Sequence, residues 1–342
     1  MHHATDNRPG VLLAMAPGIA ERLLAERHHV RLNALARTDS RLIAHDLARP
    51  TADITAALAE AEVLFTCWGA TPLTARILDS APRLRAVVHA AGSVKHHITE
   101  ACWERGITVT SAAAANALPV AEYTLATILL TNKRVLESAS RYRAKRGDLE
   151  WRDPLDGAGN YRRTVGIVGA SRIGRRVIEL LRPFDLRVLL YDPYIDAGEA
   201  TALGVESVPL DELCARSDIV TVHAPQLPST LHMIGARQLA AMRDGATLIN
   251  TARGSLVDEA ALVPELAAGR LYAVLDVTDP ETPCAGSPLY DLPNVLLTPH
   301  IAGSLGGELH RMADQALDEL ERYASGQAFA DPVLPSDLTH SA

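Results

Sequence analysis

The chain has 342 residues, 48% of them hydrophobic, which is enough to fill the cores of two domains and too many for a disordered protein. Its formal charge of −8 argues against a nucleic-acid-binding protein. Its four cysteines lie far apart, and none forms a CxxC pair, so a disulfide framework is not expected. We expect no bound metal.

The N-terminus lacks the apolar stretch of a signal peptide, and no run of about 18 apolar residues is present. We therefore expect a cytoplasmic protein that neither spans nor binds a membrane.

The first third of the chain alternates between short apolar runs and helical patterns. The runs predict strands, and a helix is expected over 18–25. This alternation is typical of βαβ units, which build a parallel sheet with helices on its faces. The predicted strands are 11–15, 63–67, 84–89 and 107–110.

A long helix is predicted from about Leu118 to Val135. Pro119 suits its first turn, where the missing N–H costs nothing. Residues 141–160 are polar and contain three glycines, so they are interpreted as a connection between domains.

Strand and helix alternate again from Thr164 onward, and an amphipathic helix is predicted over 309–323. The number of strands in this part matches one doubly wound dinucleotide-binding sheet. The predicted strands are 165–168, 187–191, 219–222, 246–250, 271–275 and 295–297.

The segment 165–174 is predicted to run from a strand through a tight turn into a helix. Gly169 and Gly174 occupy the first and third places of a G-x-G-x-x-G fingerprint, with Arg172 and Ile173 between them. The first glycine permits the turn and the last permits close helix packing, so the helix N-terminus can receive a pyrophosphate. Ser171 replaces the middle glycine. Its side chain either displaces the phosphates or donates a hydrogen bond to them.

Asp192 ends the next predicted strand, 23 residues after Gly169. A carboxylate there would accept hydrogen bonds from ribose hydroxyls and repel a 2′-phosphate, which favours NAD over NADP. The alternative is a solvated acid in the turn before Pro193.

Polar groups follow three successive predicted strands: Arg253 follows the first, acids that include Asp276 and Glu281 follow the second, and His300 follows the third. Ligands bind at the carboxyl ends of parallel strands, so all three should face one crevice. An arginine can hold a carboxylate, a histidine can exchange a proton with a carbonyl oxygen, and an acid can stabilise the charged imidazole. Each residue alone has a structural alternative, but the set of three favours hydride transfer to a 2-oxo acid.

These segments together resemble the D-isomer-specific 2-hydroxyacid dehydrogenase family from about residue 84 to about residue 303. The most specific pieces are Asn-Thr-Ala-Arg-Gly at 250–254, Leu-Asp-Val at 275–277 and Thr-Pro-His-Ile-Ala-Gly at 298–303. Residues 116–124 and 222–225 are also similar to family segments.

The resemblance implies an α/β protein with two doubly wound Rossmann-like domains, each with a parallel sheet. An NAD-binding domain, residues 140–303, is inserted into a flavodoxin-like substrate domain, residues 1–139 and 304–342. A cleft between the domains would close over the substrate. The family also implies a homodimer formed through the cofactor domain.

The resemblance also implies a role for each site residue. Arg253 binds the substrate carboxylate, His300 is the proton donor and acceptor, and Glu281 is its paired acid. Asp276 lies near the nicotinamide carboxamide. The other residues implied to line the cofactor are Thr124, His223, Thr230 and Ala252. The backbone N–H groups implied to cradle the substrate carboxylate belong to Gly92, Ser93 and Val94.

Two features depart from the usual family pattern or lie near the implied pocket. The family usually has an acid near the position of Lys95, and the positive charge of Lys95 either favours a more acidic substrate or points outward. Trp68 either lines the substrate pocket or packs against the fold. Glyoxylate, hydroxypyruvate, phosphoglycerate and bulkier 2-oxo acids all remain open as substrates.

Three other functions compete with the dehydrogenase. A non-catalytic NAD-sensing regulator on the same fold would not need the intact set of Arg253, Glu281 and His300. A formate-type dehydrogenase usually carries an amide where Glu281 stands. A binding module without nucleotide would not need the glycine turn.

Overall fold

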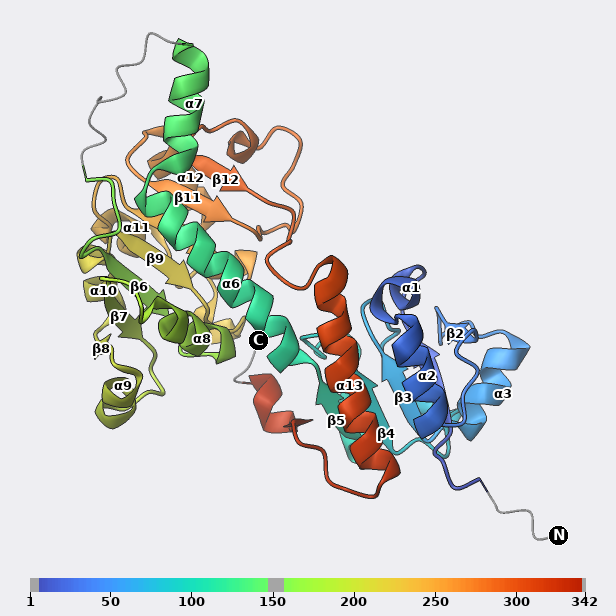
Figure 1. The fold of residues 1–342 in the computed structure, drawn as a ribbon. Helices are drawn as coiled ribbons and strands as arrows, with labels where there is room; N and C mark the ends of the chain where they lie inside the picture. The colour runs from blue at the N-terminus through green and yellow to red at the C-terminus, as the bar shows by residue number, and fades with distance from the viewer. Residues whose placement is uncertain (1–5, 147–156, 340–342) are drawn as a thin grey trace, which may run out of the picture. The chain divides into compact units, whose positions relative to one another are not determined.

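The computed structural model describes residues 6–146 and 157–339, which form two compact α/β units (Figure 1). The first unit contains the chain up to Asn116 and resumes at Ser304, and the second runs from Ala117 to Gly303. The predicted domain boundaries were 139/140 and 303/304. The part of the predicted connection at 147–156 lies outside the described residues.

The first unit contains a sheet that is parallel except for one edge strand. Its order is β13-β5-β4-β3-β1-β2, and β13 pairs antiparallel with β5. The five parallel strands follow the flavodoxin-like order, as predicted. All four predicted strands are present, whereas β2 and β13, of two residues each, are too short to give a sequence pattern. The strands are β1 (Val11–Ala14), β2 (Ile43–Ala44), β3 (Val63–Thr66), β4 (Ala86–His89), β5 (Thr108–Ser111) and β13 (Pro332–Val333).

Six helices of the first unit carry the connections between these strands and the return of the chain. The predicted helix over 18–25 is shorter than expected, and a further helix follows it directly. The helices are α1 (Ile19–Leu23), α2 (Glu26–Leu35), α3 (Ala52–Glu60), α4 (Ala75–Asp79), α5 (Glu100–Glu104) and α13 (Leu309–Ala324) within the described residues.

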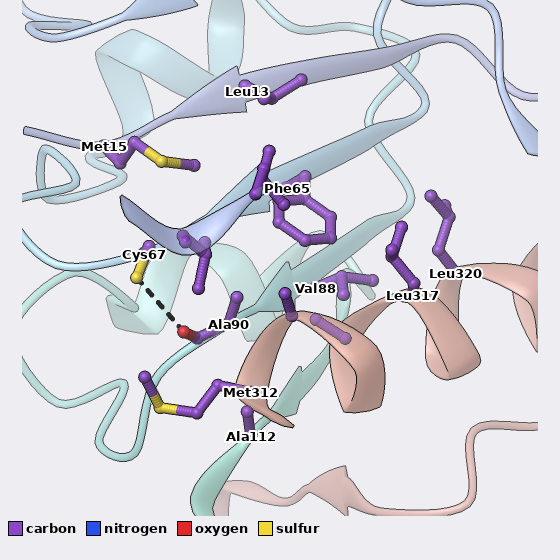
Figure 2. Packing of buried hydrophobic residues seen from close by; sticks show 14 of the residues in the cluster. Leu13, Met15, Phe65, Cys67, Val88, Ala90, Ala112, Met312, Leu317 and Leu320 are labelled. Atoms are coloured by element: carbon purple, nitrogen blue, oxygen red, sulfur yellow. Dashed lines mark hydrogen bonds between the residues drawn. The ribbon is translucent and has the colours of Figure 1, made fainter. Parts of the chain in front are cut away.

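The predicted C-terminal amphipathic helix, α13, completes the core of the first unit. Phe65 of β3 and Val88 of β4 are fully buried against Met312, Leu317 and Leu320 of α13 (Figure 2). Burying each such side chain stabilises the fold by about 1.5–3 kcal/mol. The first unit therefore depends on chain segments from both ends of the sequence.

The second unit has an all-parallel sheet in the order β12-β11-β10-β9-β6-β7-β8. All six predicted strands are present. The described residues add a seventh, β8, which was missed because its two residues are polar and exposed. The chain order reverses between β6 and β9, and this is the switch point at which such sheets bind ligands. The strands are β6 (Thr164–Val168), β7 (Arg187–Tyr191), β8 (Glu206–Ser207), β9 (Ile219–Val222), β10 (Thr247–Asn250), β11 (Tyr272–Leu275) and β12 (Val295–Leu297).

The long helix α6 (Ala113–Asn132) begins five residues before the predicted start, so Pro119 lies inside it and not in its first turn. The alanines at 112–115 explain the difference, because alanine has the highest helix propensity. The helix ends before Arg134, whose φ of 53° is left-handed, and α7 (Val135–Lys145) follows. The predicted connection from residue 141 is therefore helical as far as Lys145.

By length and composition alone, α6 could cross a membrane, which the sequence analysis did not anticipate. Its Ala121 and Ile128 are instead fully buried in the core of the second unit, beside β6. The remaining helices of that unit are α8 (Arg172–Leu181), α9 (Ala197–Leu203), α10 (Leu210–Arg216), α11 (Ala236–Ala241) and α12 (Glu259–Ala267).

Buried histidines should make the fold sensitive to acid. Burial lowers the pKa of His97 to about 4 and that of His223 to about 3, and it also lowers the pKa of His89. An unfolded histidine takes up a proton near pH 6.5, so below that pH the unfolded state holds more protons and stability falls. Each histidine contributes a slope of up to about 1.4 kcal/mol per pH unit.

Urea unfolding between pH 7 and pH 5 would measure this slope. The expected free energy of unfolding decreases toward pH 5, and a His97→Asn variant shows a shallower decrease. A wild-type unfolding midpoint that does not change over this range would contradict the prediction.

Candidate active site

At two positions of the turn between β6 and α8, only glycine fits. Gly169 has a φ of 100°, and a Cβ there would lie 2.7 Å from the backbone N of Ala224. A Cβ on Gly174 would lie 2.1 Å from the carbonyl O of Gly169. Both distances are far below van der Waals contact, so these glycines allow the turn and α8 to pack closely against the sheet.

Ser171 fits the turn without backbone strain, since its φ of −63° and ψ of 175° are ordinary extended values. Its Oγ accepts a hydrogen bond from the backbone N–H of Gly174 at 3.3 Å, so the side chain caps α8. The hydroxyl proton remains available to a phosphate. Arg172 and Ile173 are the first residues of α8, whose first-turn N–H groups suit an anion. The turn therefore fits a pyrophosphate.

Asp192 follows β7 and lies against the same turn. Its Oδ2 accepts from the backbone N–H of Ala170 at 2.7 Å, and its Oδ1 accepts from that of Tyr194 at 2.8 Å. A carboxylate offers about four lone-pair positions, so two such bonds leave capacity for ribose hydroxyls. The acid is thus held beside the glycine turn.

The other residues predicted to contact the cofactor lie in the second unit. His223 follows β9, is buried, and has its Nε2 3.0 Å from Thr221 Oγ1. Thr230 Oγ1 donates to the carbonyl of Pro225 at 2.6 Å. Thr124, on α6, is fully buried and donates to the carbonyl of Val120, while Ala252 follows β10. Their contacts with a cofactor stay predictions.

Arg253 lies three residues after β10 in a turn organised by a buried side chain. Asn250 is 1% exposed; its Oδ1 accepts from the N–H of Ala252 at 3.1 Å, and its Nδ2 donates to the carbonyl of Arg253 at 2.8 Å. Asn250 belongs to the motif at 250–254, and its role was not predicted from the sequence. This residue holds the backbone that presents Arg253.

The charge of Arg253 is partly desolvated. Burial lowers the pKa of its guanidinium, and the nearby carboxylate of Glu281 raises it. An arginine remains protonated at neutral pH even so. The site therefore contains a cation whose attraction for a carboxylate is strengthened by its surroundings.

His300 and Glu281 are within hydrogen-bond distance, with 2.5 Å between His300 Nδ1 and Glu281 Oε1. An ionised carboxylate only accepts, so Nδ1 carries the proton of this bond. The ring nitrogen Nε2 is then the one that can exchange a proton with a ligand. Because Glu281 also acts on Arg253, the three predicted catalytic side chains lie in one region, beyond the carboxyl ends of β10, β11 and β12.

Asp276 anchors the segment that carries His300. It is 1% exposed and accepts hydrogen bonds from Thr298 Oγ1 at 2.6 Å, and from the N–H groups of Ile301 and Ala302 at 2.8 Å. The Asp276 carbonyl accepts from the N–H of His300 at 2.8 Å. This acid thus supports the backbone on both sides of His300, a role that was not predicted, and its contact with a carboxamide stays a prediction.

The predicted carboxylate cradle, Gly92 to Val94, belongs to the first unit and follows β4. Val94 is buried, and its carbonyl accepts from the N–H groups of His97 and Ile98. Trp68 follows β3 with its side chain 40% exposed. The roles predicted for these residues are not decided by their positions.

Comparison with known proteins adds a family to this geometry. The family model for "D-isomer specific 2-hydroxyacid dehydrogenase, NAD binding domain" matches residues 125–302. A D-3-phosphoglycerate dehydrogenase of Mycobacterium leprae is 34% identical over 81% of this chain and 52% of its own length. The chain thus spans about half the length of that relative.

Two further relatives match over most of their own length. A glyoxylate reductase of Korarchaeum cryptofilum is 34% identical over 75% of this chain and 78% of its own length. The crystal structure of an NADPH-dependent glyoxylate/hydroxypyruvate reductase from Sinorhizobium meliloti is 27% identical, covers 98% of this chain and 100% of its own, and superposes with a TM-score of 0.76.

Proposed function

Because the chain belongs to the D-isomer-specific 2-hydroxyacid dehydrogenase family, we propose that it interconverts a small 2-oxo acid and its D-2-hydroxy acid. The observation that carries this proposal is the hydrogen bond of 2.5 Å between His300 and Glu281, with Arg253 nearby. This arrangement combines a proton donor, its stabilising acid and a carboxylate-binding cation, and the turn that fits a dinucleotide lies at the carboxyl end of another strand of the same parallel sheet.

Each side chain has a distinct task in this reaction. A bound nicotinamide coenzyme supplies the hydride. Arg253 holds the substrate carboxylate, and a bidentate pair would fix the orientation of the adjacent carbonyl. His300 gives the proton on Nε2 to the carbonyl oxygen, and Glu281 stabilises the imidazolium. In the reverse direction neutral His300 accepts the hydroxyl proton. In the first unit, Gly92, Ser93 and Val94 remain our candidates for further carboxylate contacts.

An assay with a panel of 2-oxo acids tests the proposal. Purified protein is mixed with NADH or NADPH and with glyoxylate, hydroxypyruvate, phosphohydroxypyruvate or a bulkier 2-oxo acid, and coenzyme absorbance is followed. We expect turnover with at least one acid. Binding of NADH without turnover of any acid would instead favour a non-catalytic NAD-sensing regulator.

We propose NAD as the preferred coenzyme, because the Asp192 carboxylate beside the glycine turn would repel a 2′-phosphate. Asp192→Asn keeps one acceptor oxygen and removes the charge. The ratio of kcat/KM with NADPH to that with NADH should rise about tenfold, which corresponds to roughly 1.4 kcal/mol. Steady-state kinetics with both coenzymes measure this ratio.

The matched control is Asp185→Asn, which removes an exposed acid just before the other end of β7. The control should leave the ratio unchanged. A ratio that stays at the wild-type value in Asp192→Asn would refute the role of Asp192 in coenzyme choice.

We also propose that the protein is a cytoplasmic homodimer. Four large apolar side chains of the second unit are exposed on α6 and α7, namely Leu130, Val135, Leu136 and Tyr142, and such side chains suit a protein interface. All four cysteines, which lie within the described residues, are free thiols, consistent with a reducing compartment. Sedimentation at twice the chain mass and cell fractionation would test these two points.

A further inference from the structure

A tyrosine hydroxyl on helix α6 lies close to the segment that carries His300. Tyr123 Oη lies 2.9 Å from Thr298 Oγ1, and Thr298 Oγ1 lies 2.6 Å from Asp276 Oδ1. Thr298 is two residues before His300. The three side chains thus form a hydrogen-bonded row that links α6 to the segment 298–302.

The direction of the protons in this row follows from its acceptor end. Asp276 receives donors from Thr298, Ile301 and Ala302, so the Thr298 hydroxyl donates to the carboxylate. Thr298 Oγ1 then accepts, and the Tyr123 hydroxyl donates to it. Burial raises the pKa of Tyr123, so this hydroxyl keeps its proton at neutral pH. Hydrogen bonds that end on a charge are stronger than neutral ones.

The row acts on a segment whose backbone needs support. His300 has a φ of 54°, a left-handed conformation that costs a residue with a Cβ free energy. Such a conformation persists where neighbouring contacts impose it. Asp276 holds residues on both sides of His300, and Tyr123 holds Thr298 in the orientation that makes one of these contacts.

We propose that Tyr123 is a positioning residue for His300, acting through Thr298 and Asp276. Its hydroxyl holds the segment 298–302 in place. In this position His300 Nδ1 donates a hydrogen bond to Glu281, and Nε2 faces the substrate. This inference rests on the proposed dehydrogenase function. The competing explanation is that Tyr123 only packs its ring between α6 and the sheet.

Tyr123→Phe separates the two explanations, because it removes the hydroxyl and keeps the ring. We expect kcat to fall about tenfold with little change in the dissociation constant of NADH, since a catalytic group displaced by a fraction of an ångström loses rate. The pH dependence of kcat should also shift, because the hydrogen bond between Glu281 and the His300 imidazole would be weaker. Tyr161→Phe, which removes an exposed hydroxyl three residues before β6, is the matched control and should change neither property.

Thr298 provides a second, independent test. Thr298→Val should lower kcat at least as much as Tyr123→Phe, and Thr298→Ser should restore most of it by returning the hydroxyl. The double variant Tyr123→Phe/Thr298→Val should lose no more than Thr298→Val alone, because both changes break the same row. The proposal is overturned if the decreases in kcat of the two single variants multiply in the double variant. It is also overturned if Tyr123→Phe has the wild-type kcat and pH profile.

Two measurements distinguish a failure of the proposed function from a failure of the positioning role. If the wild-type protein turns over no 2-oxo acid, the dehydrogenase proposal fails. The position of His300 is then read from its imidazole resonances in an NMR pH titration. A changed titration in Tyr123→Phe, but not in Tyr161→Phe, supports the positioning role. An unchanged titration in Tyr123→Phe overturns it.

Discussion

Replacing His300 with alanine should lower kcat for 2-oxo acid reduction by roughly 10²–10⁴-fold, the usual contribution of a positioned acid or base. The imidazole is held by Glu281 through Nδ1, so its loss removes the proton on Nε2 that the carbonyl oxygen needs. The dissociation constant of NADH should change little, because the glycine turn and Asp192 lie at other strands of the sheet. Single-turnover rates and fluorescence titration measure the two quantities.

His310→Ala is a suitable control for this change. His310 is a partly exposed histidine of α13 in the first unit, and its ring lies 5.3 Å from that of His28. The control should retain nearly full turnover. Turnover by His300→Ala at the wild-type rate would remove this residue from the mechanism.

The second large effect is expected from Gly254→Ala. A Cβ at this position would lie 2.0 Å from the carbonyl carbon of Thr278 and 2.5 Å from the backbone N of Asp279. The neighbouring atoms are backbone, so one chain segment must move. Overpacking of this kind costs about 1–3 kcal/mol of stability. Because Arg253 is the adjacent residue, a displacement near 1 Å should also lower kcat/KM by about 10²-fold.

Gly286→Ala controls for the loss of a glycine in the same region of the chain. Apart from Gly286 itself and its two chain neighbours, no heavy atom of the described residues lies within 4 Å of a Cβ built on Gly286, so stability and kcat/KM should stay near wild type. Thermal unfolding and steady-state kinetics compare the two variants. A Gly254→Ala protein with the wild-type Tm and kcat/KM would show that the backbone at Thr278 yields without consequence.

Most strands could be predicted from the sequence because a parallel strand is buried on both faces and leaves a continuous apolar run. The runs of β6, β9 and β10 are clear examples, with nearly every side chain buried. The strands β2, β8 and β13 have only two residues each, so no local pattern marks them, and their pairing with β1, β7 and β5 depends on the tertiary fold. The start of α6 differs from the prediction because proline favours the first turn of a helix, whereas the alanines before Pro119 extend this helix upstream.

Some residues of the candidate site could likewise be predicted from the sequence, and others could not. Residues that follow a strand end within a motif, such as Arg253 and His300, could be found because the edge of a parallel sheet brings them together. Asn250, Tyr123 and Thr298 could not, because their tasks depend on which buried backbone and side-chain groups require partners. The capping role of Ser171 was not predicted, although serine before the first turn of a helix is a favoured N-cap and gives a sequence signal for it.

The return of α13 to the first sheet has a consequence for synthesis on the ribosome. Domains usually fold as they emerge, N-terminal first. Here the strands with Phe65 and Val88 emerge early, yet their covering helix, with Met312 and Leu317, is made nearly 250 residues after Phe65. The second unit is formed by one continuous stretch of chain, so it can fold before α13 has been made. Until then, one apolar face of the first sheet remains uncovered. The nascent protein therefore passes through a stage in which its earliest segment is its last to mature.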